Sequence, residues 1–384
     1  MSRPVVLKAL WGAAVLVLVA GCSSGGTEDR PGTAPPTSVS APASDPPASA
    51  SATASGSASP GGGRVSVTGT LTEGLRSPWG LAELPGGDLL VSSRDERTIT
   101  RVDGGSGAKT SLGEVPGVVP GGEGGLMGLA VRDGWVYAYL TAASDNRIVR
   151  MRYGGGDGDR LGAPEPVLTG IPKGVVHNGG RIAFGPDGML YAGTGETGET
   201  GLAQDRSSLG GKILRMTPEG RPAPGNPFAD SVVYSYGHRN VQGIAWDSAG
   251  RLWAAEFGQN TWDELNLIKP GKNYGWPEAE GQAGREGFVD PVAQWPTSEA
   301  SPSGIAYARG AIWMAGLRGE QLWRVPLSGE ERSGDPEAFL SGEYGRLRTV
   351  LAGGDGRLWL VNSETDTRGT PEPGDDRILR LEVS

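Results

Sequence analysis

The chain has 384 residues, of which 66 are glycine and 29 are proline, and both residue types disfavour long helices. It carries 44 acidic and 35 basic residues, for a net charge of −9, and has no long basic run, so a nucleic acid is not expected as a partner. A single cysteine excludes an internal disulfide framework and a multi-cysteine zinc site, and two histidines argue against a histidine-rich metal centre.

The first predicted element is a short apolar stretch from Ala9 to Ala20 that follows Arg3 and Lys8. It is too short to cross about 30 Å of hydrocarbon as a helix, so it is typical of a signal-peptide core and not of a membrane anchor. Small residues then lead directly to Cys22, which resembles the lipobox of bacterial lipoproteins, where the cysteine receives a diacylglycerol. We expect residues 1–21 to be a lipoprotein signal peptide and Cys22 to be lipidated. The alternative is an ordinary secretory signal with an incidental cysteine.

Residues 22–63 follow and consist almost entirely of alanine, serine, threonine, proline and glycine. Such a composition cannot bury enough apolar area to offset the entropy of ordering the chain, so we predict a disordered tether. The expected folded body is residues 64–384. We therefore expect an extracytoplasmic protein whose contact with the membrane is its lipid anchor alone.

Six similar segments recur along the predicted folded body. Each has a short apolar strand, a tight turn that usually holds glycine with aspartate or a second glycine, and another apolar strand, which is a β-hairpin pattern. Equivalent positions in the six segments are Leu81, Leu129, Ile182, Ile244, Ile305 and Val350. Repeats of about 40–60 residues built from short strands are typical of propeller blades. The sequence therefore predicts an all-β protein, a six-bladed β-propeller, in which a strand near residues 65–71 completes the last blade and closes the ring.

Two histidines occupy equivalent places in this pattern. His177 and His238 each stand just before the inner strand of a repeat, where propeller loops surround the central channel. A histidine with a pKa near neutrality can accept a proton from a sugar hydroxyl. Taken alone, each histidine could equally be one that only hydrogen-bonds its own loop.

Arginines recur at the same level of the repeats, at Arg239, Arg318, Arg346 and Arg348. In Arg346-Leu347-Arg348 the alternation of a strand points both guanidinium groups to one side. Four arginines that converge on one channel indicate an anionic ligand with several carboxylates or phosphates. Pairing of each arginine with a local aspartate or glutamate is the alternative.

The order of the motifs carries a family resemblance. The chain contains, in order, GGEGGLMGLAV, HNGGRIAFGPDGMLYAGTGETG, YGHRNVQGIAW, DELNLIKPGKNYGWP and GRLRTV. Together these motifs resemble the soluble quinoprotein glucose dehydrogenase family, also called glucose/sorbosone or aldose sugar dehydrogenases, over residues 71–383. The resemblance implies a six-bladed propeller with pyrroloquinoline quinone (PQQ) and calcium as cofactors. It also implies oxidation of the anomeric carbon of an aldose to a lactone, with electrons passed to an acceptor that the sequence does not identify.

The resemblance also assigns roles to individual residues. His177 matches the family's catalytic base, and Arg239 matches the group that stabilises negative charge on the quinone oxygen. The positions that match the cofactor site are Glu123, Asn240, Asp263, Arg318, Arg346 and Arg348, with Arg318 standing where lysine is usual. Calcium would be held by the backbone carbonyls of Gly258 and Gln259.

Four positions depart from the family pattern. Val176 stands where an acid is frequent, Glu196 where aspartate is usual, Phe257 where a polar residue is usual, and Gln259 where proline is usual. These departures leave open a sugar- or ligand-binding propeller without cofactor chemistry. A calcium-dependent lactonase is a further alternative, although that class needs carboxylate side chains at its metal.

Overall fold

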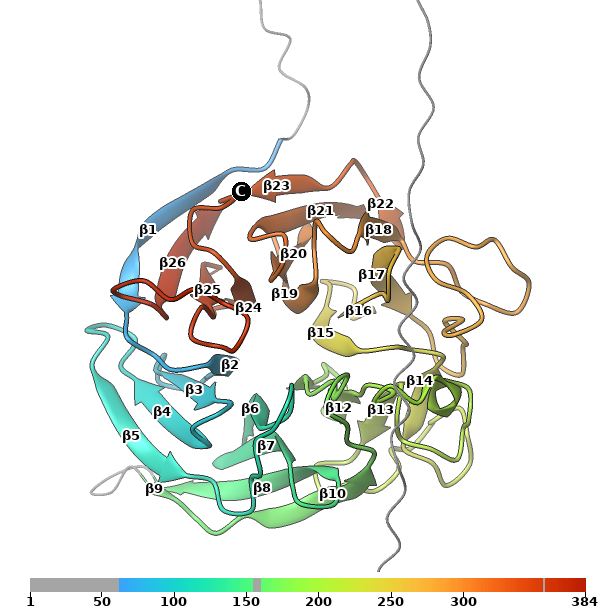
Figure 1. Cartoon of the computed structure of the whole chain (residues 1–384), viewed down its shortest axis with the longest axis horizontal. Coiled ribbons are helices and arrows are strands. Elements are labelled where there is room, and N and C mark those ends of the chain that lie inside the picture. Colours follow the sequence, from blue (N-terminus) through green and yellow to red (C-terminus); the bar gives the residue numbers. More distant parts are fainter. Residues whose placement is uncertain (1–61, 155–159, 355) are drawn as a thin grey trace, which may run out of the picture. The chain divides into compact units, whose positions relative to one another are not determined.

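The computed structural model describes residues 62–154, 160–354 and 356–384 (Figure 1). The predicted signal peptide, Cys22 and nearly all of the predicted tether lie outside these residues. Within the described ranges the chain forms no α-helix, and its one helical segment is a single 3-10 turn, η1 (Thr200–Ala203). In this part of the chain no helix is long and apolar enough to cross a membrane.

Six antiparallel sheets follow one another around a ring, as Figure 1 shows. The first contains β2 (Pro78–Glu83), β3 (Leu89–Ser93), β4 (Thr98–Val102) and β5 (Lys109–Glu114). The second contains β6 (Leu126–Arg132), β7 (Trp135–Thr141), β8 (Asn146–Gly154) and β10 (Glu165–Ile171), with β9 (Arg160–Leu161) paired to β8. The third contains β11 (Ile182–Phe184), β12 (Leu190–Gly193), β13 (Lys212–Met216) and β14 (Val233–Tyr236).

The other three sheets repeat this order from the inner strand outwards. The fourth contains β15 (Val241–Trp246), β16 (Leu252–Glu256), β17 (Trp262–Ile268) and β18 (Ala293–Pro296). The fifth contains β19 (Pro302–Ala308), β20 (Ala311–Gly316) and β21 (Leu322–Ser328), to which both β22 (Glu331–Arg332) and β23 (Glu337–Phe339) pair. The sixth contains β24 (Leu347–Ala352), β25 (Leu358–Asn362), β26 (Ile378–Val383) and β1 (Val65–Thr72). The prediction of a six-bladed β-propeller is confirmed.

The ring closes where the two ends of the described chain meet. The outer strand β1 pairs antiparallel with β26, from Val65 opposite Val383 to Thr72 opposite Ile378. Figure 1 shows the blue β1 beside the red β26. A strand from the start of the domain therefore completes the last blade, as the sequence predicts.

The glycines that precede the apolar residue of several repeats have a packing role. A Cβ atom on Gly128 of β6 would lie 2.2 Å from the carbonyl oxygen of Gly180, and one on Gly243 of β15 would lie 2.4 Å from that of Ser303. Neighbouring inner strands therefore approach backbone to backbone near the ring axis, which only glycine allows. This approach brings the loops at one end of the inner strands together around the channel.

Aromatic side chains fill the blades. Trp253 in the fourth sheet and Trp313 in the fifth are fully buried. Trp79 on the inner strand β2 is different, because it is buried yet lines the cavity described below. Trp253 and Trp313 thus belong to the blade core.

Candidate active site

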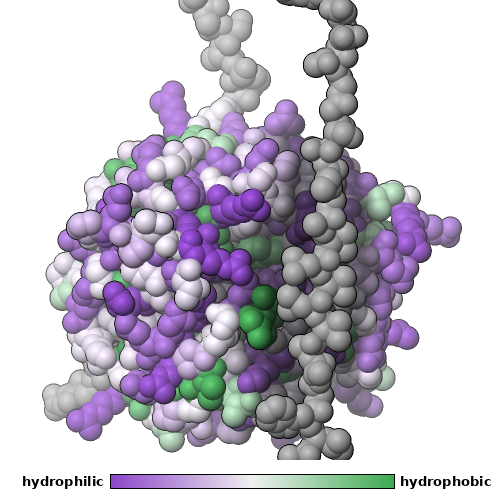
Figure 2. Space-filling model, viewed as in Figure 1, coloured by the Kyte–Doolittle hydropathy of each residue, from purple (hydrophilic) through white to green (hydrophobic). Residues whose placement is uncertain are grey.

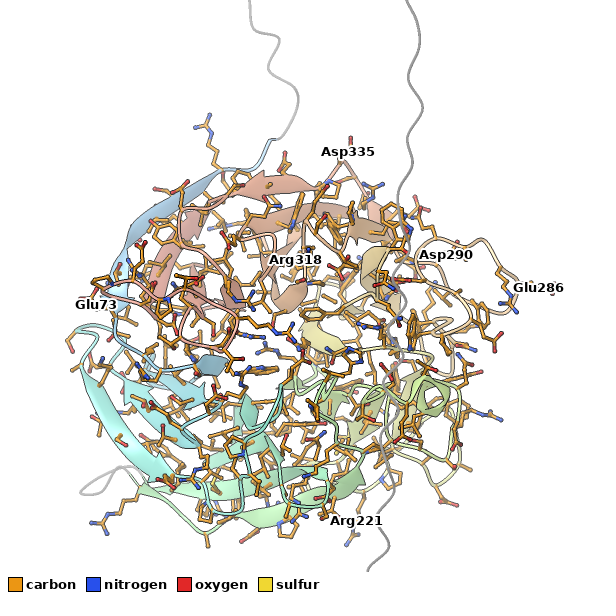
Figure 3. The ribbon with its side chains drawn as sticks, in the orientation of Figure 1. Glu73, Arg221, Glu286, Asp290, Arg318 and Asp335 are labelled. Carbon is orange, nitrogen blue, oxygen red and sulfur yellow. The ribbon has the colours of Figure 1, made fainter. Side chains whose placement is uncertain are left out.

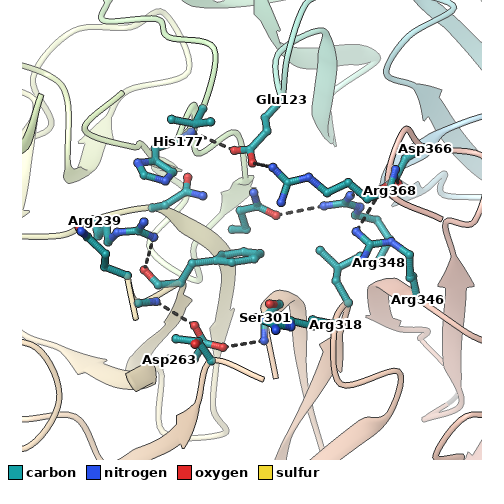
Figure 4. A pocket seen from close by; sticks show the side chains of 18 of the residues that line it. Glu123, His177, Arg239, Asp263, Ser301, Arg318, Arg346, Arg348, Asp366 and Arg368 are labelled. Atoms are coloured by element: carbon teal, nitrogen blue, oxygen red, sulfur yellow. Dashed lines mark hydrogen bonds and ion pairs between the residues drawn. The ribbon is translucent and has the colours of Figure 1, made fainter. Parts of the chain in front are cut away.

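A cavity of about 420 Å³ opens over the central channel, and all six sheets contribute to its wall. Most of its residues come from the loops that enter the inner strands and from the loops that follow the second strands, while Trp79, Gln242 and Arg348 lie on inner strands. The ten residues that the family resemblance assigns to catalysis, PQQ and calcium all line it: Glu123, His177, Arg239, Asn240, Gly258, Gln259, Asp263, Arg318, Arg346 and Arg348. Figure 4 labels seven of them, among them His177, Arg239 and Arg348. The face of the ring in this view is largely hydrophilic (Figure 2).

His177 lies between two carboxylates. Its ring Nδ1 is 2.5 Å from Oε1 of the buried Glu196, and its backbone N–H donates to Oε2 of Glu123 at 2.9 Å. With Glu196 accepting a proton from Nδ1, the lone pair of the neutral imidazole is on Nε2. His177 therefore offers a base to the cavity, oriented from behind by Glu196. The glutamate that departs from the family's usual aspartate holds the ring.

Arg346 and Arg348 share one carboxylate, Asp366. Their Nη2 atoms lie 3.4 Å and 3.0 Å from Oδ2 of Asp366, so the two guanidinium groups do lie on one side of the strand. Burial lowers the pKa of Arg348 to about 10. Burial also acts to raise the pKa of Asp366, but the charges of Arg348 and Arg346 overcome it and hold that pKa below its ordinary value. One carboxylate for the buried Arg348 and the half-buried Arg346 leaves positive charge in the wall.

Arg239 stands on the other side of the cavity. Its Nη1 donates to the Phe257 carbonyl at 3.2 Å, and its guanidinium lies 5.4 Å from the centroid of the Trp276 ring. Burial lowers its pKa, although nearby carboxylates such as Glu196 act in the opposite direction. The buried Nε of Arg239 has no hydrogen-bond partner in the described structure.

Asp263 and Asn240 hold the loops of the cavity. Asp263 accepts the N–H of Gly258 at 2.8 Å and of Ser301 at 2.6 Å, and burial raises its pKa to about 6. The Oδ1 atom of Asn240 accepts the N–H of Gly179 at 2.9 Å. Both side chains line the cavity, and their oxygens are engaged by backbone groups.

In the loop after β16, the backbone N–H groups point toward Glu280 and the carbonyl groups that precede them point away from it. Oε1 of Glu280 accepts the N–H groups of Gln259 at 2.8 Å and of Asn260 at 3.3 Å. In a trans peptide the C=O points opposite to the N–H that follows it, so the carbonyls of Gly258 and Gln259 point away from Glu280. No group of three or more His, Cys, Asp or Glu side chains suited to a metal occurs in the described part of the chain. A cation at this wall would depend on these carbonyl oxygens.

The other cavity residues include several that the sequence motifs did not single out. They are Trp79, Arg94, Gln242, Asp366 and Arg368. Arg94 follows the second strand of its sheet, β3, as Arg318 follows β20, and Asp366 and Arg368 come after the second strand β25. Alignment of the repeats could therefore have found Arg94, Asp366 and Arg368. Arg368 forms an ion pair of 2.7 Å with Glu123, which links the loops before the second sheet and after β25.

Two expected residues differ in their surroundings. His238 does not line the cavity, since it is fully buried between Glu256 and Ser235 and stacks on Tyr274 at 4.6 Å between ring centroids. The loop-binding alternative thus applies to His238 and not to His177. Arg318 is exposed and lies toward the middle of the ring, whereas Glu286 and Asp335 lie at its rim (Figure 3).

The match to a known protein family agrees with this arrangement. The sequence matches the model of the Glucose / Sorbosone dehydrogenase family over residues 75–371. The chain belongs to this family. The match spans the loops that line the cavity, together with most of the six-bladed propeller expected from the repeats.

Solved structures and curated relatives are similar to this family member over most of the chain. The PQQ-bound form of the aldose sugar dehydrogenase from Streptomyces coelicolor is 70% identical, with a TM-score of 0.83, over 85% of this chain and 99% of that one. A Thermus thermophilus protein described as a putative oxidoreductase (glucose dehydrogenase) is 45% identical, with a TM-score of 0.76, over 84% of this chain and 100% of that one. The aldose sugar dehydrogenase YliI of Escherichia coli is 30% identical over 77% of this chain and 89% of its own length.

Proposed function

We propose that this family member is a PQQ-dependent dehydrogenase that oxidises the anomeric carbon of an aldose to a lactone. The observation that carries the proposal is one cavity lined both by six arginines and by His177, whose ring is held by the buried Glu196. The arginines are Arg94, Arg239, Arg318, Arg346, Arg348 and Arg368. The 70% identical Streptomyces coelicolor structure with PQQ bound supports the same conclusion.

The residues present fit this cofactor. PQQ carries three carboxylates, and the buried Nε atoms of Arg239, Arg346 and Arg348 have no partner among the described residues. Charge-assisted hydrogen bonds from arginines to carboxylates would satisfy such donors. When bound, PQQ supplies an electrophilic quinone that accepts a hydride. Arg346, Arg348 and Arg318 would hold its carboxylates.

The chain's own residues would supply the proton chemistry. Nε2 of His177 would take the proton from the anomeric hydroxyl of the sugar while a hydride leaves the same carbon. Glu196 would stabilise the imidazolium through Nδ1, as the third member of a catalytic triad does. Arg239 would stabilise the negative charge that develops during the transfer.

Calcium fits the loop after β16. The carbonyls of Gly258 and Gln259 belong to residues that line the cavity and point away from Glu280, and calcium prefers oxygen ligands of this kind. The carboxylate of Glu280 fixes this loop through its backbone N–H groups. We include calcium in the proposal as the cation held there.

The decisive experiment titrates the purified protein with PQQ and calcium and then measures dye reduction with a panel of aldoses. His177→Ala should lower turnover by about 10²–10⁴, the usual contribution of a positioned base, while PQQ affinity stays close to wild type. Changing Arg346 and Arg348 to alanine should have the opposite effect, with PQQ affinity reduced more than the turnover of the PQQ-bound protein. If the wild-type protein binds no PQQ in the presence of calcium, the enzyme proposal is wrong and a ligand-binding propeller is favoured. The apolar residues Val176 and Phe257 would then be features of a binding site without cofactor chemistry.

The location of the enzyme is a separate part of the proposal. We infer from the lipobox-like sequence that Cys22 is lipidated and holds the enzyme at the extracytoplasmic face of the membrane. Cys22→Ser should then release the protein from the membrane fraction into the medium, as measured by immunoblotting of the fractions. Retention of the variant on the membrane would reject lipid anchoring.

A further inference from the structure

Arg181 is a buried arginine in contact with two residues that line the active-site cavity. It directly precedes the inner strand β11 and is 7% exposed. Its guanidinium lies 4.4 Å from the centroid of the Trp79 ring. Its Nε donates to the backbone carbonyl of Gln242 at 2.7 Å. Arg181 itself lines a different cavity along the channel, of about 300 Å³, so it stands behind Trp79 and Gln242 and does not contact a ligand in the active site.

No carboxylate neutralises this guanidinium. The hydrogen-bond acceptors of Arg181 are neutral, namely the Gln242 carbonyl and Oγ1 of Thr349 at 3.0 Å, and no ion pair to Arg181 occurs among the residues described. Burial, and then the charge of Arg348, lowers its pKa to about 9. Burying a charge without an opposite charge costs free energy of folding. Two hydrogen bonds to neutral acceptors are therefore a weak explanation for an arginine at position 181.

Arg348 connects Arg181 to the cavity wall. The Oε1 atom of the Gln242 side chain accepts Nη1 of Arg348 at 3.1 Å, while the backbone oxygen of the same residue accepts Arg181. The guanidinium of Arg348 also lies 5.9 Å from the Trp79 ring centroid, so both arginines contact the same indole. Asp366 pairs with Arg348 and Arg346, and leaves Arg181 uncompensated. Two buried cations therefore stand in successive layers at this wall.

We propose that Arg181 is a positioning residue whose uncompensated charge, acting through Trp79 and Gln242, tightens binding of the anionic quinone cofactor and raises its reduction potential. This inference rests on the proposed function. A charge in a buried, low-dielectric region acts over a longer range than one in water, and no counter-charge cancels its field at the cavity. Because the reduced cofactor is the more electron-rich form, a nearby cation stabilises it more than the oxidised form.

A purely structural role for Arg181 predicts a different result. Arg181 joins inner strands of different sheets, since its partners Gln242 and Thr349 lie on β15 and β24. Loss of these bonds would lower the melting temperature of the cofactor-free protein without moving a reduction potential. The two roles are separated by variants that remove the charge and differ in hydrogen-bonding capacity.

The experiment compares R181Q, which keeps hydrogen-bond donors, with R181M, which keeps none. The matched control is R285Q, because Arg285 is half-exposed and pairs with Glu278 away from both cavities. Three quantities are measured for each protein in calcium: the PQQ dissociation constant by fluorescence titration, the midpoint potential of the bound cofactor, and the melting temperature without cofactor.

Both Arg181 variants should weaken PQQ binding by about ten-fold or more and shift the potential to lower values, by about 30 mV for each ten-fold loss of preference for the reduced form. The melting temperature should fall more in R181M than in R181Q, and R285Q should match wild type throughout. An R181Q protein with wild-type PQQ affinity and midpoint potential would overturn the inference. The inference would also be wrong if the loss of PQQ affinity in the two variants were proportional to their loss of melting temperature. If wild type itself binds no PQQ, the proposed function fails instead.

Discussion

His177 has a backbone φ of 53°, which places a non-glycine residue in the left-handed region. That conformation costs about 1–3 kcal/mol and persists where the surroundings hold it. Glu123 holds the backbone N–H of His177 and Glu196 holds its ring. The strained residue is the one that offers a base to the cavity, so both carboxylates orient the same imidazole.

Glu196 is the residue through which this orientation can be tested. Glu196→Gln keeps an acceptor for Nδ1 but removes the charge that stabilises the imidazolium. Turnover should fall about 10- to 100-fold, because a hydrogen bond to a charged group contributes about 1.5–3 kcal/mol. PQQ affinity should stay near wild type, and the acid limb of the kcat/KM profile should move to lower pH. A variant with wild-type turnover and an unchanged pH profile would remove Glu196 from the mechanism.

At the scale of the element, the fourth sheet contains a buried acidic network below the cavity. The Nδ2 atom of Asn266 donates to Glu256 on β16 and to Glu264 on β17, each at 3.0 Å, and Nδ1 of His238 lies 2.7 Å from Glu256. Burial, together with the charge of Glu256, raises the pKa of Glu264 to about 8. Glu264 is therefore protonated at neutral pH, and the loop at Gly281 depends on it through an N–H donated to Oε1 at 2.6 Å.

This raised pKa makes the stability of the fold pH-dependent with a defined sign. The folded state keeps a proton on Glu264 that the unfolded state releases near its ordinary pKa of 4.5, so the stabilisation is present at low pH and is lost as pH rises through about 8. Relative to Glu264→Gln, the wild-type free energy of unfolding should fall by about 2 kcal/mol between pH 6 and 8. Urea unfolding at several pH values measures this difference. Parallel pH curves for the two proteins would show that Glu264 does not titrate there.

At the scale of the whole molecule, closure of the ring depends on one strand far from the rest of its sheet in sequence. The sixth sheet takes β24, β25 and β26 from the end of the chain and β1 from the start of the folded body. Without β1, the edge of β26 would lose its hydrogen-bonding partner, and a propeller gains stability from stacking complete blades.

Deletion of β1 should therefore destabilise the propeller strongly. Loss of residues 65–72 should lower the melting temperature by roughly 5–10 °C, since several kcal/mol correspond to a few degrees each in a domain of this size. The control deletes an equal length from the serine- and proline-rich stretch at residues 40–47, which should leave the melting temperature unchanged. Similar melting temperatures for the two deletions would show that this seam does not hold the ring.

The propeller follows from short-range features of the sequence, because each hairpin is a local segment with turn glycines and alternating apolar residues. It also placed Arg346 and Arg348 together, since a strand's two-residue period puts both arginines on one side, whereas only the family motifs distinguished His177 from His238. The family motifs supplied the other roles at the cavity. These features depend on residues close together in the chain or on an ordered set of motifs.

Which loop residues meet around the cavity depends on how the six sheets close into a ring. His177 and His238 precede inner strands in the same way, yet only His177 lines the cavity, because side-chain direction depends on the backbone conformation of each loop. Arg94 and Asp366 reach the cavity from opposite ends of the sequence. Arg181 stands behind the wall because six inner strands converge on one axis, and that convergence is a property of the closed ring and of no single repeat.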